Sequence, residues 1–220
     1  MEQNINIHPD SAQRLGALSE LYESGGRGPG TVSGGQGDPG GVSYGLYQLA
    51  SKTGTAAAFI KTEGRIWAGE LCAAPGTSAF SQAWKAIALR EAAAFAAAQH
   101  AFIERSHYRP AVNAVLSASG HDLDARHQAL RDAVWSTAVQ HGSAARLLTA
   151  AVGDADRSAS RGTAAHDRAC IEAIYRRRTD HVLAIAAKSR PAVRRTLTNV
   201  AQRRYPAELA AALEMLASLD

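Results

Sequence analysis

The sequence predicts a mainly α-helical protein that carries one small β-hairpin. Apolar residues make up 46% of the 220 residues, and alanine supplies much of that fraction. Ten of the nineteen glycines fall within residues 22–48. Alanine favours helices and their close packing, whereas a run of glycines excludes helix. We therefore expect a single domain over residues 1–220, in which a glycine-rich segment interrupts the helices.

Helical periodicity, glycine and proline predict the elements in order. A first helix begins at Asp10 or Ser11 and ends after Glu23, at Gly25 and Gly26. Next, "TVS" and "GVSY", joined by "GGQGDPG", predict an irregular hairpin. Further helices are expected over residues 44–62, with a break near Gly54, and over 78–108, as one or two helices stopped by Pro110. Others are expected over 111–119, 124–141, 143–152, 165–187, 191–204 and 206–219. Over 78–108, the apolar spacing turns six side chains inward: Phe80, Trp84, Ile87, Phe95, Phe102 and Ile103.

Composition narrows the environment in which the protein works. No run of about 18 apolar residues exists, so we expect no membrane insertion. The N-terminal residues lack the basic and apolar regions of a secretory signal, so we expect synthesis in the cytoplasm and delivery by another system. The net charge of +4 suits a polyanion, which includes nucleic acid, an acidic membrane face and an anionic cell wall; the alternative is ordinary solubilising charge. Cys72 and Cys170 are expected to be buried free thiols, with a disulfide as the alternative.

Several kinds of reactive site are not supported by the motifs. The eight histidines form no HExxH or HxH pattern and have no nearby CxxC, so we expect surface or packing roles and no metal or cofactor. The glycines do not spell a phosphate-binding GxxxxGK[ST]. Ser24 lies in "ESGG" rather than in the GxSxG of a nucleophile elbow.

Two carboxylates flank the glycine-rich segment and can carry chemistry. Glu23 lies at the end of a predicted helix, at the edge of an apolar face, a setting that raises a carboxyl pKa and favours a general acid. Asp38 lies in a polar loop, where a carboxylate stays ionised. Glycoside hydrolysis uses such a pair across a cleft. The alternative is that Glu23 has no special role and that Asp38 only initiates the turn "DPGG".

The segment "YESGG…GGVSYGLYQL" resembles the lysozyme-like superfamily, in particular soluble lytic transglycosylases and goose-type lysozymes. In those families a helix-ending Glu-Ser is followed by a loop and a Ser-x-x-Gly-x-x-Gln-like segment. That pattern maps onto the following residues here, with one residue less between the second serine and the glycine: Glu23, Ser24, Ser43, Gly45 and Gln48. The spacing from Asp38 to Ser43 also resembles phage lysozymes and chitosanases. The runs "ESGGRGPGTVS…GDPGGVSYGLYQLASKTGT", "AQHAFIERSHY" and "DAVWSTAVQHG" are similar to lysozyme-like domains of phage tails and type VI secretion spike proteins.

This resemblance implies a lysozyme-like helical domain with the hairpin beside its active-site cleft, and cleavage of the peptidoglycan glycan strand. Glu23 would be the acid, and Asp38 with Ser43 would favour a hydrolase (muramidase) over a lytic transglycosylase. It suggests these substrate contacts: Tyr44, Tyr47, Gln48, Gln140 and His141. Trp135 is expected in the core.

The implied partners are peptidoglycan, a secretion spike or phage tail protein and an immunity protein, with no nucleic acid. An antibacterial effector or phage lysin would then act on the cell wall, in the periplasm of a target cell. A catalytically idle wall-binding module of the same fold and a chitosanase-like hydrolase remain as alternatives.

Overall fold

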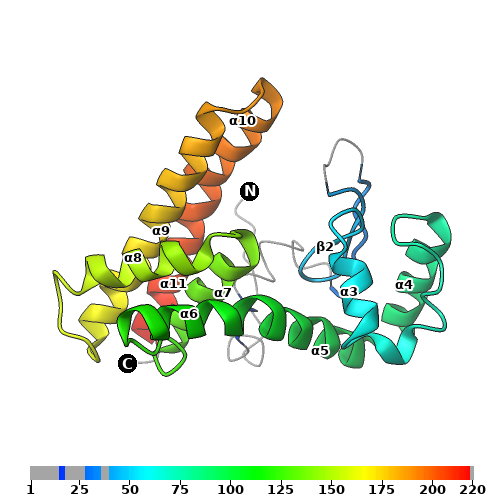
Figure 1. The fold of residues 1–220 in the computed structure, drawn as a ribbon, viewed down its shortest axis with the longest axis horizontal. Coiled ribbons are helices and arrows are strands. Elements are labelled where there is room, and N and C mark those ends of the chain that lie inside the picture. Colours follow the sequence, from blue (N-terminus) through cyan, green and yellow to red (C-terminus); the bar gives the residue numbers. More distant parts are fainter. Residues whose placement is uncertain (1–14, 18–27, 36–39, 219–220) are drawn as a thin grey trace. The chain divides into compact units, whose positions relative to one another are not determined.

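The computed structural model describes residues 15–17, 28–35 and 40–218. The chain divides into two compact units. Glu20–Ser106 form one, called here the hairpin unit, and Met1–Ser19 with His107–Asp220 form the other, called the helical unit. In the part of the chain that is described, the fold is mainly helical with a two-stranded antiparallel sheet, as the sequence predicts (Figure 1). That residues 1–220 form a single domain stays a prediction.

The hairpin unit contains the two-stranded sheet and the helices that carry its buried aromatic side chains. Its elements are β1 (Ser43–Tyr44), β2 (Leu49–Ala50), α3 (Thr55–Lys61), the 3₁₀ turn η1 (Arg65–Trp67), α4 (Ser78–Arg90) and α5 (Ala92–Ile103). Thr77 caps α4, because its side chain accepts a hydrogen bond from the Phe80 backbone N–H. The six side chains predicted to point inward from α4 and α5 are all buried.

The sheet is a short hairpin between residues 40 and 52. Ser43 pairs with Ala50 and Tyr44 with Leu49. Val32 adds an antiparallel bridge to Tyr44, so "TVS" and "GVSY" do pair as predicted. The predicted helix over 44–62 is wrong in its first half, where the chain turns back as a strand. The physical reason is left-handed backbone, with φ of 74° at Gly45, 52° at Gln48 and 84° at Gly54.

An aromatic cluster forms the core of the hairpin unit. Trp84 is fully buried, and its ring centroid lies 4.6 Å from that of Phe95 and 5.6 Å from that of Phe59. Tyr44 joins the same cluster, 5.2 Å from Trp84. The strand that carries Ser43 is therefore anchored by its next residue to the centre of the unit.

The helical unit begins where the π-helical turn η2 (Glu104–Tyr108) leads directly into α6 (Arg109–Ser119). Pro110 was expected to stop a helix. Instead it lies in the first turn of α6, directly after the π-helical turn η2. The remaining elements are α7 (Gln128–Gln140), α8 (Ala144–Ala155), α9 (Ala164–Ala187), α10 (Pro191–Asn199), the π-helical turn η3 (Val200–Arg204) and α11 (Tyr205–Ser218).

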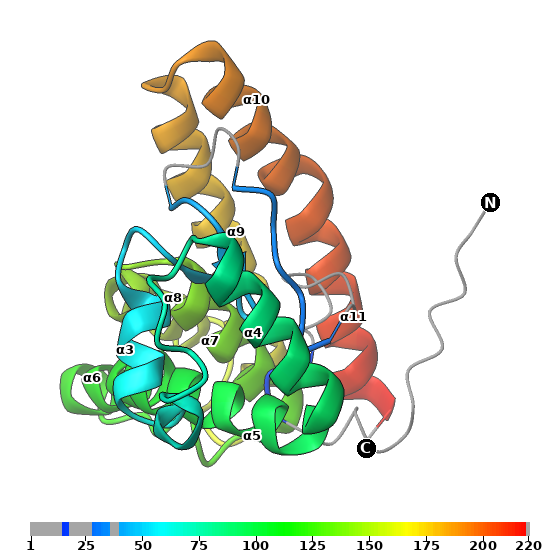
Figure 2. The ribbon, with the colours of Figure 1, turned by 90° about the vertical axis from the view of Figure 1, so that its right-hand side faces the viewer.

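Helix α9 is the central element of this unit. It packs against α7, α8, α10 and α11, and Figures 1 and 2 both show the α10–α11 rod running back alongside it. Helix α7 begins at Gln128 rather than near Asp124, because His127 caps it by accepting a hydrogen bond from Ala129 N–H. Trp135 on α7 is fully buried, in agreement with its predicted place in the core.

The structure also bears on two other expectations. None of the described helices is both long and apolar enough to cross a membrane. Both cysteines are free thiols, but only Cys170 is buried, whereas Cys72 is exposed. The expectation of burial is therefore wrong for Cys72, which lies between η1 and α4.

Candidate functional site

The two predicted catalytic carboxylates, Glu23 and Asp38, lie outside the described residues. The third predicted catalytic residue, Ser43, lies on β1 and is 6% exposed. Its backbone is fixed by Ser33 on two sides: Ser33 N–H donates to Ser43 C=O at 2.9 Å, and Ser43 N–H donates to Ser33 Oγ at 2.8 Å. No hydrogen bond joins the Ser43 hydroxyl to another of the described residues.

A buried amide on α5 holds the glycine-rich segment in place. Gln99 is fully buried; its Oε1 accepts from Leu46 N–H at 3.0 Å and its Nε2 donates to Pro29 C=O at 3.1 Å. Gly45 lies directly against this amide, and a Cβ at position 45 would be 2.1 Å from Gln99 Oε1. Glycine is therefore required at position 45, both by its positive φ and by this close approach.

The two tyrosines predicted to contact substrate are buried in the hairpin unit. Tyr44 is fully buried; its hydroxyl accepts from Gly76 N–H at 2.9 Å and lies 3.0 Å from Ser81 Oγ. Tyr47 is 4% exposed, and its hydroxyl lies 2.9 Å from His100 Nδ1. Both rings pack and position the hairpin, and their burial argues against the predicted direct contact.

Gln48 is the more accessible of the predicted contacts on the hairpin. It is half-buried, and its Nε2 donates to Gly45 C=O at 3.1 Å. That bond closes the turn between β1 and β2 and stabilises the left-handed backbone at Gln48.

Gln140 and His141 belong to the helical unit, at the C-terminal end of α7. Gln140 Oε1 accepts from Arg178 Nη2 at 2.6 Å and from the Tyr205 hydroxyl at 2.9 Å. His141 is buried, with Nε2 3.1 Å from the same hydroxyl. Burial, with the nearby charge of Arg178, lowers the pKa of His141 to about 3. His141 is therefore a neutral packing residue at neutral pH, and Gln140 is the more accessible of the two.

These two residues border a buried ion pair that sequence reasoning missed. Arg178 and Glu208 are fully buried, and Arg178 Nη1 lies 3.1 Å from Glu208 Oε2. The guanidinium is placed between two rings, 4.7 Å from the centroid of Tyr175 and 4.4 Å from that of Tyr205. In "YRRRTDH", the local sequence does not distinguish the buried Arg178 from the two less buried arginines before it. The signal that could have found it is its spacing of three residues, about one helical turn, from Tyr175.

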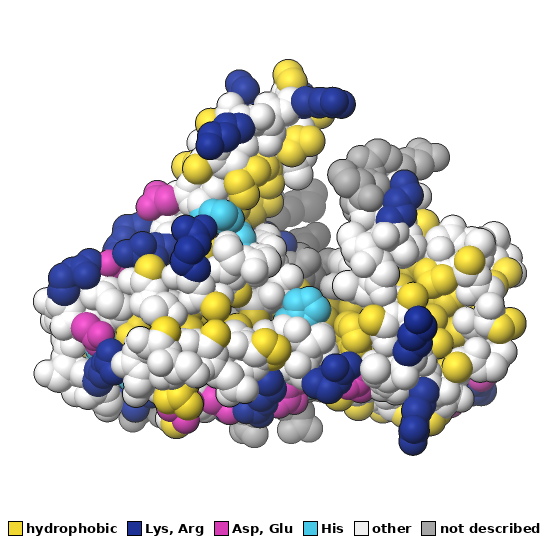
Figure 3. Space-filling view, in the orientation of Figure 1, with side chains coloured by type: hydrophobic (Ala, Val, Ile, Leu, Met, Phe, Trp, Pro, Cys, Tyr) yellow, Lys and Arg dark blue, Asp and Glu magenta, His cyan; other side chains and the backbone are white. Residues whose placement is uncertain are grey.

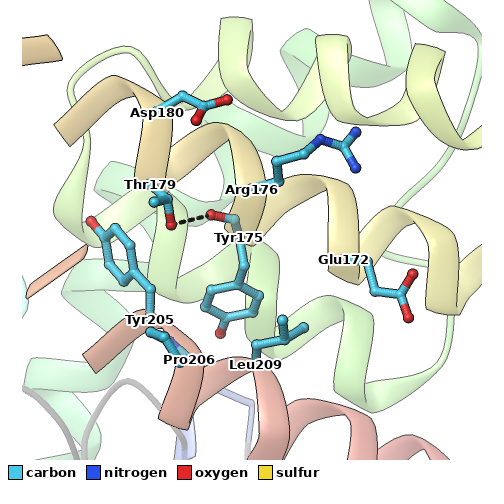
Figure 4. A pocket seen from close by; sticks show the side chains of 8 residues that line it. All are labelled: Glu172, Tyr175, Arg176, Thr179, Asp180, Tyr205, Pro206 and Leu209. Atoms are coloured by element: carbon cyan, nitrogen blue, oxygen red, sulfur yellow. Dashed lines mark hydrogen bonds between the residues drawn. The ribbon is translucent and has the colours of Figure 1, made fainter. Parts of the chain in front are cut away.

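A pocket of about 230 Å³ shares Tyr175 and Tyr205 with this cluster (Figure 4). Its lining comes from α9 and α11: Glu172, Tyr175, Arg176, Thr179, Asp180, Tyr205, Pro206 and Leu209. The rings of Tyr175 and Tyr205 also contact Arg178, and the Tyr205 hydroxyl donates a hydrogen bond to Gln140. The pocket contains none of the residues predicted from sequence, and its volume is too small for a polymer chain.

The residues thus fall into two groups. Ser43, Tyr44, Tyr47 and Gln48 share the hairpin unit, whereas Gln140 and His141 belong to the helical unit. A set that offers metal ligands lies elsewhere in the helical unit, at His121, His166 and Cys170.

Known proteins resemble the chain across both units. Residues 15–204 match the family described as "Type VI secretion system spike protein VgrG3-like, C-terminal". The type VI secretion system spike protein VgrG3 of Vibrio cholerae serotype O1 is 39% identical over 136 residues, which are 61% of this chain and 13% of that protein. The chain thus corresponds to a small part of the length of this relative. With most of its residues covered by the match, the chain belongs to the family of VgrG3-like C-terminal domains of type VI secretion spike proteins.

Proposed function

We propose that the chain is a peptidoglycan-cleaving glycoside hydrolase, a muramidase of lysozyme-like fold. Glu23 protonates the leaving glycosidic oxygen, and Asp38 acts as the base for an attacking water that the Ser43 hydroxyl helps to hold. Gln48 and Gln140 contact the sugar chain, while Tyr44, Tyr47 and His141 keep the surrounding elements in place.

The observation that carries this proposal is the hairpin around Ser43. Its backbone is fixed by Ser33, its neighbour Tyr44 is anchored in the core, and its hydroxyl has no partner among the described residues. A serine that only packed would be expected to use its hydroxyl locally. Ser43 follows Asp38 by five positions in the sequence, and we propose that the two side chains share the attacking water.

The proposed reaction needs two carboxylates in different states. An inverting glycosidase separates them by about 6.5–9.5 Å so that a water fits between, whereas a retaining enzyme holds them about 5–5.5 Å apart. Because Asp38 comes from a glycine-rich loop and Glu23 from a predicted helix end, we expect the wider spacing and inversion. The alternative is a lytic transglycosylase, which needs no second carboxylate and would use Glu23 alone.

The family supports the proposed place of action. Its description and the name of the Vibrio relative both refer to the type VI secretion spike. We propose that the chain travels with such a spike as an antibacterial effector, acts on the cell wall of the target cell, and is matched by an immunity protein in the producing cell. The net charge of +4 suits an anionic wall.

Mass spectrometry of peptidoglycan digested by the purified chain tests the reaction directly. A muramidase yields fragments with reducing ends, and a transglycosylase yields anhydro ends. Intact peptidoglycan together with retained binding to it would identify a wall-binding module. Cleavage of chitosan but not of peptidoglycan would identify a chitosanase-like enzyme.

Variants then test the assigned residues. Glu23→Gln should lower turnover by about 10²–10⁴-fold, the range for loss of a positioned acid, with an unchanged melting curve. Asp38→Asn should lose activity that azide restores. Glu20→Gln is the matched control, a carboxylate three residues before Glu23, and should retain activity. Full activity in Glu23→Gln or Asp38→Asn would remove that residue from the mechanism.

A further inference from the structure

Two histidines and a cysteine meet in the interior of the helical unit. His121 lies in the loop between α6 and α7, and His166 and Cys170 lie one turn apart on α9. The histidines are 7% and 0% exposed and the cysteine 0%. One nitrogen or sulfur atom from each lies within 4.8 Å of the others. Forty-five positions separate His121 from His166, so no short motif reveals the group.

Hydrogen bonding determines which nitrogen of His166 is available. Its Nε2 lies 3.0 Å from Asp156 Oδ1. Arg161 bonds both oxygens of Asp156, at 2.8 and 2.7 Å, and holds the pKa of that carboxyl well below its usual range. The carboxylate therefore accepts, and Nε2 carries the proton. In the neutral ring Nδ1 then has the lone pair, and it lies 3.6 Å from Cys170 Sγ.

This arrangement has the form found around bound metals. A metal-binding histidine usually donates its second N–H to a carboxylate, which fixes the tautomer and the direction of the ring. Asp156 does this for His166, and Arg161 in turn fixes Asp156.

The third side chain, His121, has an atom without a partner. Its Nε2 is buried and makes no hydrogen bond within the described chain. Burial first, and then nearby cationic side chains, lower the pKa of His121, so the ring is neutral at neutral pH. Its ring centroid lies 5.0 Å from that of His166, at an interplanar angle of 78°. In the tautomer that carries its proton on Nδ1, Nε2 has a lone pair and can act as a metal ligand.

We propose that His121 Nε2, His166 Nδ1 and the Cys170 thiolate bind one Zn²⁺ ion. Typical Zn–N and Zn–S bonds of about 2.0 and 2.3 Å at a tetrahedral angle hold nitrogen and sulfur about 3.5 Å apart. The distance between His166 Nδ1 and Cys170 Sγ, 3.6 Å, is already close to this value. On binding, the thiol releases its proton to solvent, and a water molecule takes the fourth position.

The same atoms also form a chain of cysteine, histidine and aspartate, the order used by cysteine nucleophiles. Two observations argue against that use. Cys170 is fully buried, so no substrate reaches its sulfur. Burial also raises the pKa of its thiol to about 12, the opposite of an activated nucleophile.

The proposed ion has a structural role, separate from the chemistry at the hairpin. It joins the loop before α7 to α9, and through Asp156 to the end of α8. It would thus tie together segments around positions 121, 156 and 168 that are otherwise joined by packing and by ion pairs. The proposal does not depend on the muramidase activity.

The test uses the full chain, purified without a polyhistidine tag. Elemental analysis should find one zinc per chain, and Zn²⁺ added to chelator-treated protein should raise Tm by about 5–10 °C at a hundredfold excess over Kd. Co²⁺ in place of Zn²⁺ should show the near-ultraviolet absorption of a sulfur-to-cobalt bond. Cys170→Ser should abolish that absorption and weaken zinc binding by at least about tenfold.

The matched control is Cys72→Ser, which removes the exposed thiol and should leave zinc content and cobalt absorption unchanged. If Cys170→Ser does not fold, His121→Gln provides the second variant, since it changes a loop residue and removes one ligand. Wild-type protein that binds no zinc would overturn the proposal. So would equal zinc affinity in wild type, Cys170→Ser and His121→Gln, or binding of Cu⁺ with no response to Zn²⁺ or Co²⁺.

Discussion

The hairpin unit and the helical unit have different interiors. In the described part of the hairpin unit, the fully buried side chains are mostly aromatic and aliphatic, and the buried polar ones are neutral: Thr31, Ser43 and Gln99. The helical unit buries charged and titratable groups, among them Asp132, Asp167, Arg178 and Glu208. Apolar packing tolerates small changes of shape, whereas a buried charge requires its partner. Substitutions in the interiors of the two units should therefore lower the free energy of unfolding for different reasons.

The largest expected effect comes from separating the buried pair in the helical unit. Glu208→Ala leaves Arg178 buried without its carboxylate, which should cost about 3–5 kcal/mol of unfolding free energy. Chemical denaturation measures it. The control is Glu172→Ala, which breaks the exposed Arg168–Glu172 pair on α9 and should cost less than about 0.5 kcal/mol. Equal losses in the two variants would contradict the distinction between the two interiors.

The contrast between the units also explains what the sequence could predict. The six inward-facing residues of α4 and α5 recur at helical spacing, and all six are buried. They could be predicted because the helical repeat of apolar residues can be seen in the sequence of a single helix. The buried pair of Arg178 and Glu208 joins residues 30 positions apart, and nothing in either local sequence distinguishes it from an exposed charge. Long-range pairing of polar groups is a tertiary property.

Errors in the predicted elements have local causes. The helix expected over residues 44–62 has helical composition, but positive φ at Gly45 and Gln48 bends the chain into a hairpin. Pro110 stops one helix in the usual interpretation and starts another here. For the candidate site, sequence placed Ser43 correctly on a hairpin strand, but it could not show that Tyr44 points into the core.

The second effect tests the hairpin unit at its one buried amide. Gly45→Ala combines a positive φ with a clash against Gln99, and we expect a loss of about 2–3 kcal/mol from left-handed strain and a disturbed hydrogen bond. Thermal unfolding measures it. Gly69→Ala is the matched control in the same unit, because position 69 has no positive φ and no neighbour within 4 Å of a Cβ. A neutral Gly45→Ala would show that the hairpin shifts freely on α5.

The third effect is a pH dependence that belongs to the helical unit. The unfolded chain protonates His141 near pH 6.5, but the folded chain does so only near pH 3, because burial and Arg178 disfavour the charge. Stability from this group is therefore complete above pH 6.5 and falls as the pH drops toward 3, by at most about 1.4 kcal/mol per pH unit. His141→Gln should flatten the change between pH 7 and 5. An unchanged slope would assign the dependence to other groups.

The smallest effect concerns one of the ion pairs of the hairpin unit. Glu63 pairs with the exposed Arg105, whose hydrogen bond lowers the pKa of Glu63 to about 2. Because solvent screens such a pair, Glu63→Gln should cost about 1 kcal/mol or less. The folding stability that this pair contributes is present above pH 4.5 and is lost as the pH falls toward 2. Denaturation at low and high salt measures the cost, and a loss as large as that of Glu208→Ala would remove the contrast between the units.

Gln99 has a consequence for how the glycine-rich segment can vary. By bonding Pro29 and Leu46 with the two ends of one amide, it closes the intervening chain into a loop whose ends are fixed on α5. The entropy of such a closure grows slowly with length, by about 0.6 kcal/mol for each doubling. Insertions or deletions between Ser33 and Gly40 should therefore be tolerated by the fold, whereas Tyr44 and Gly45, nearer the end of this loop, are held by the aromatic core and by Gln99.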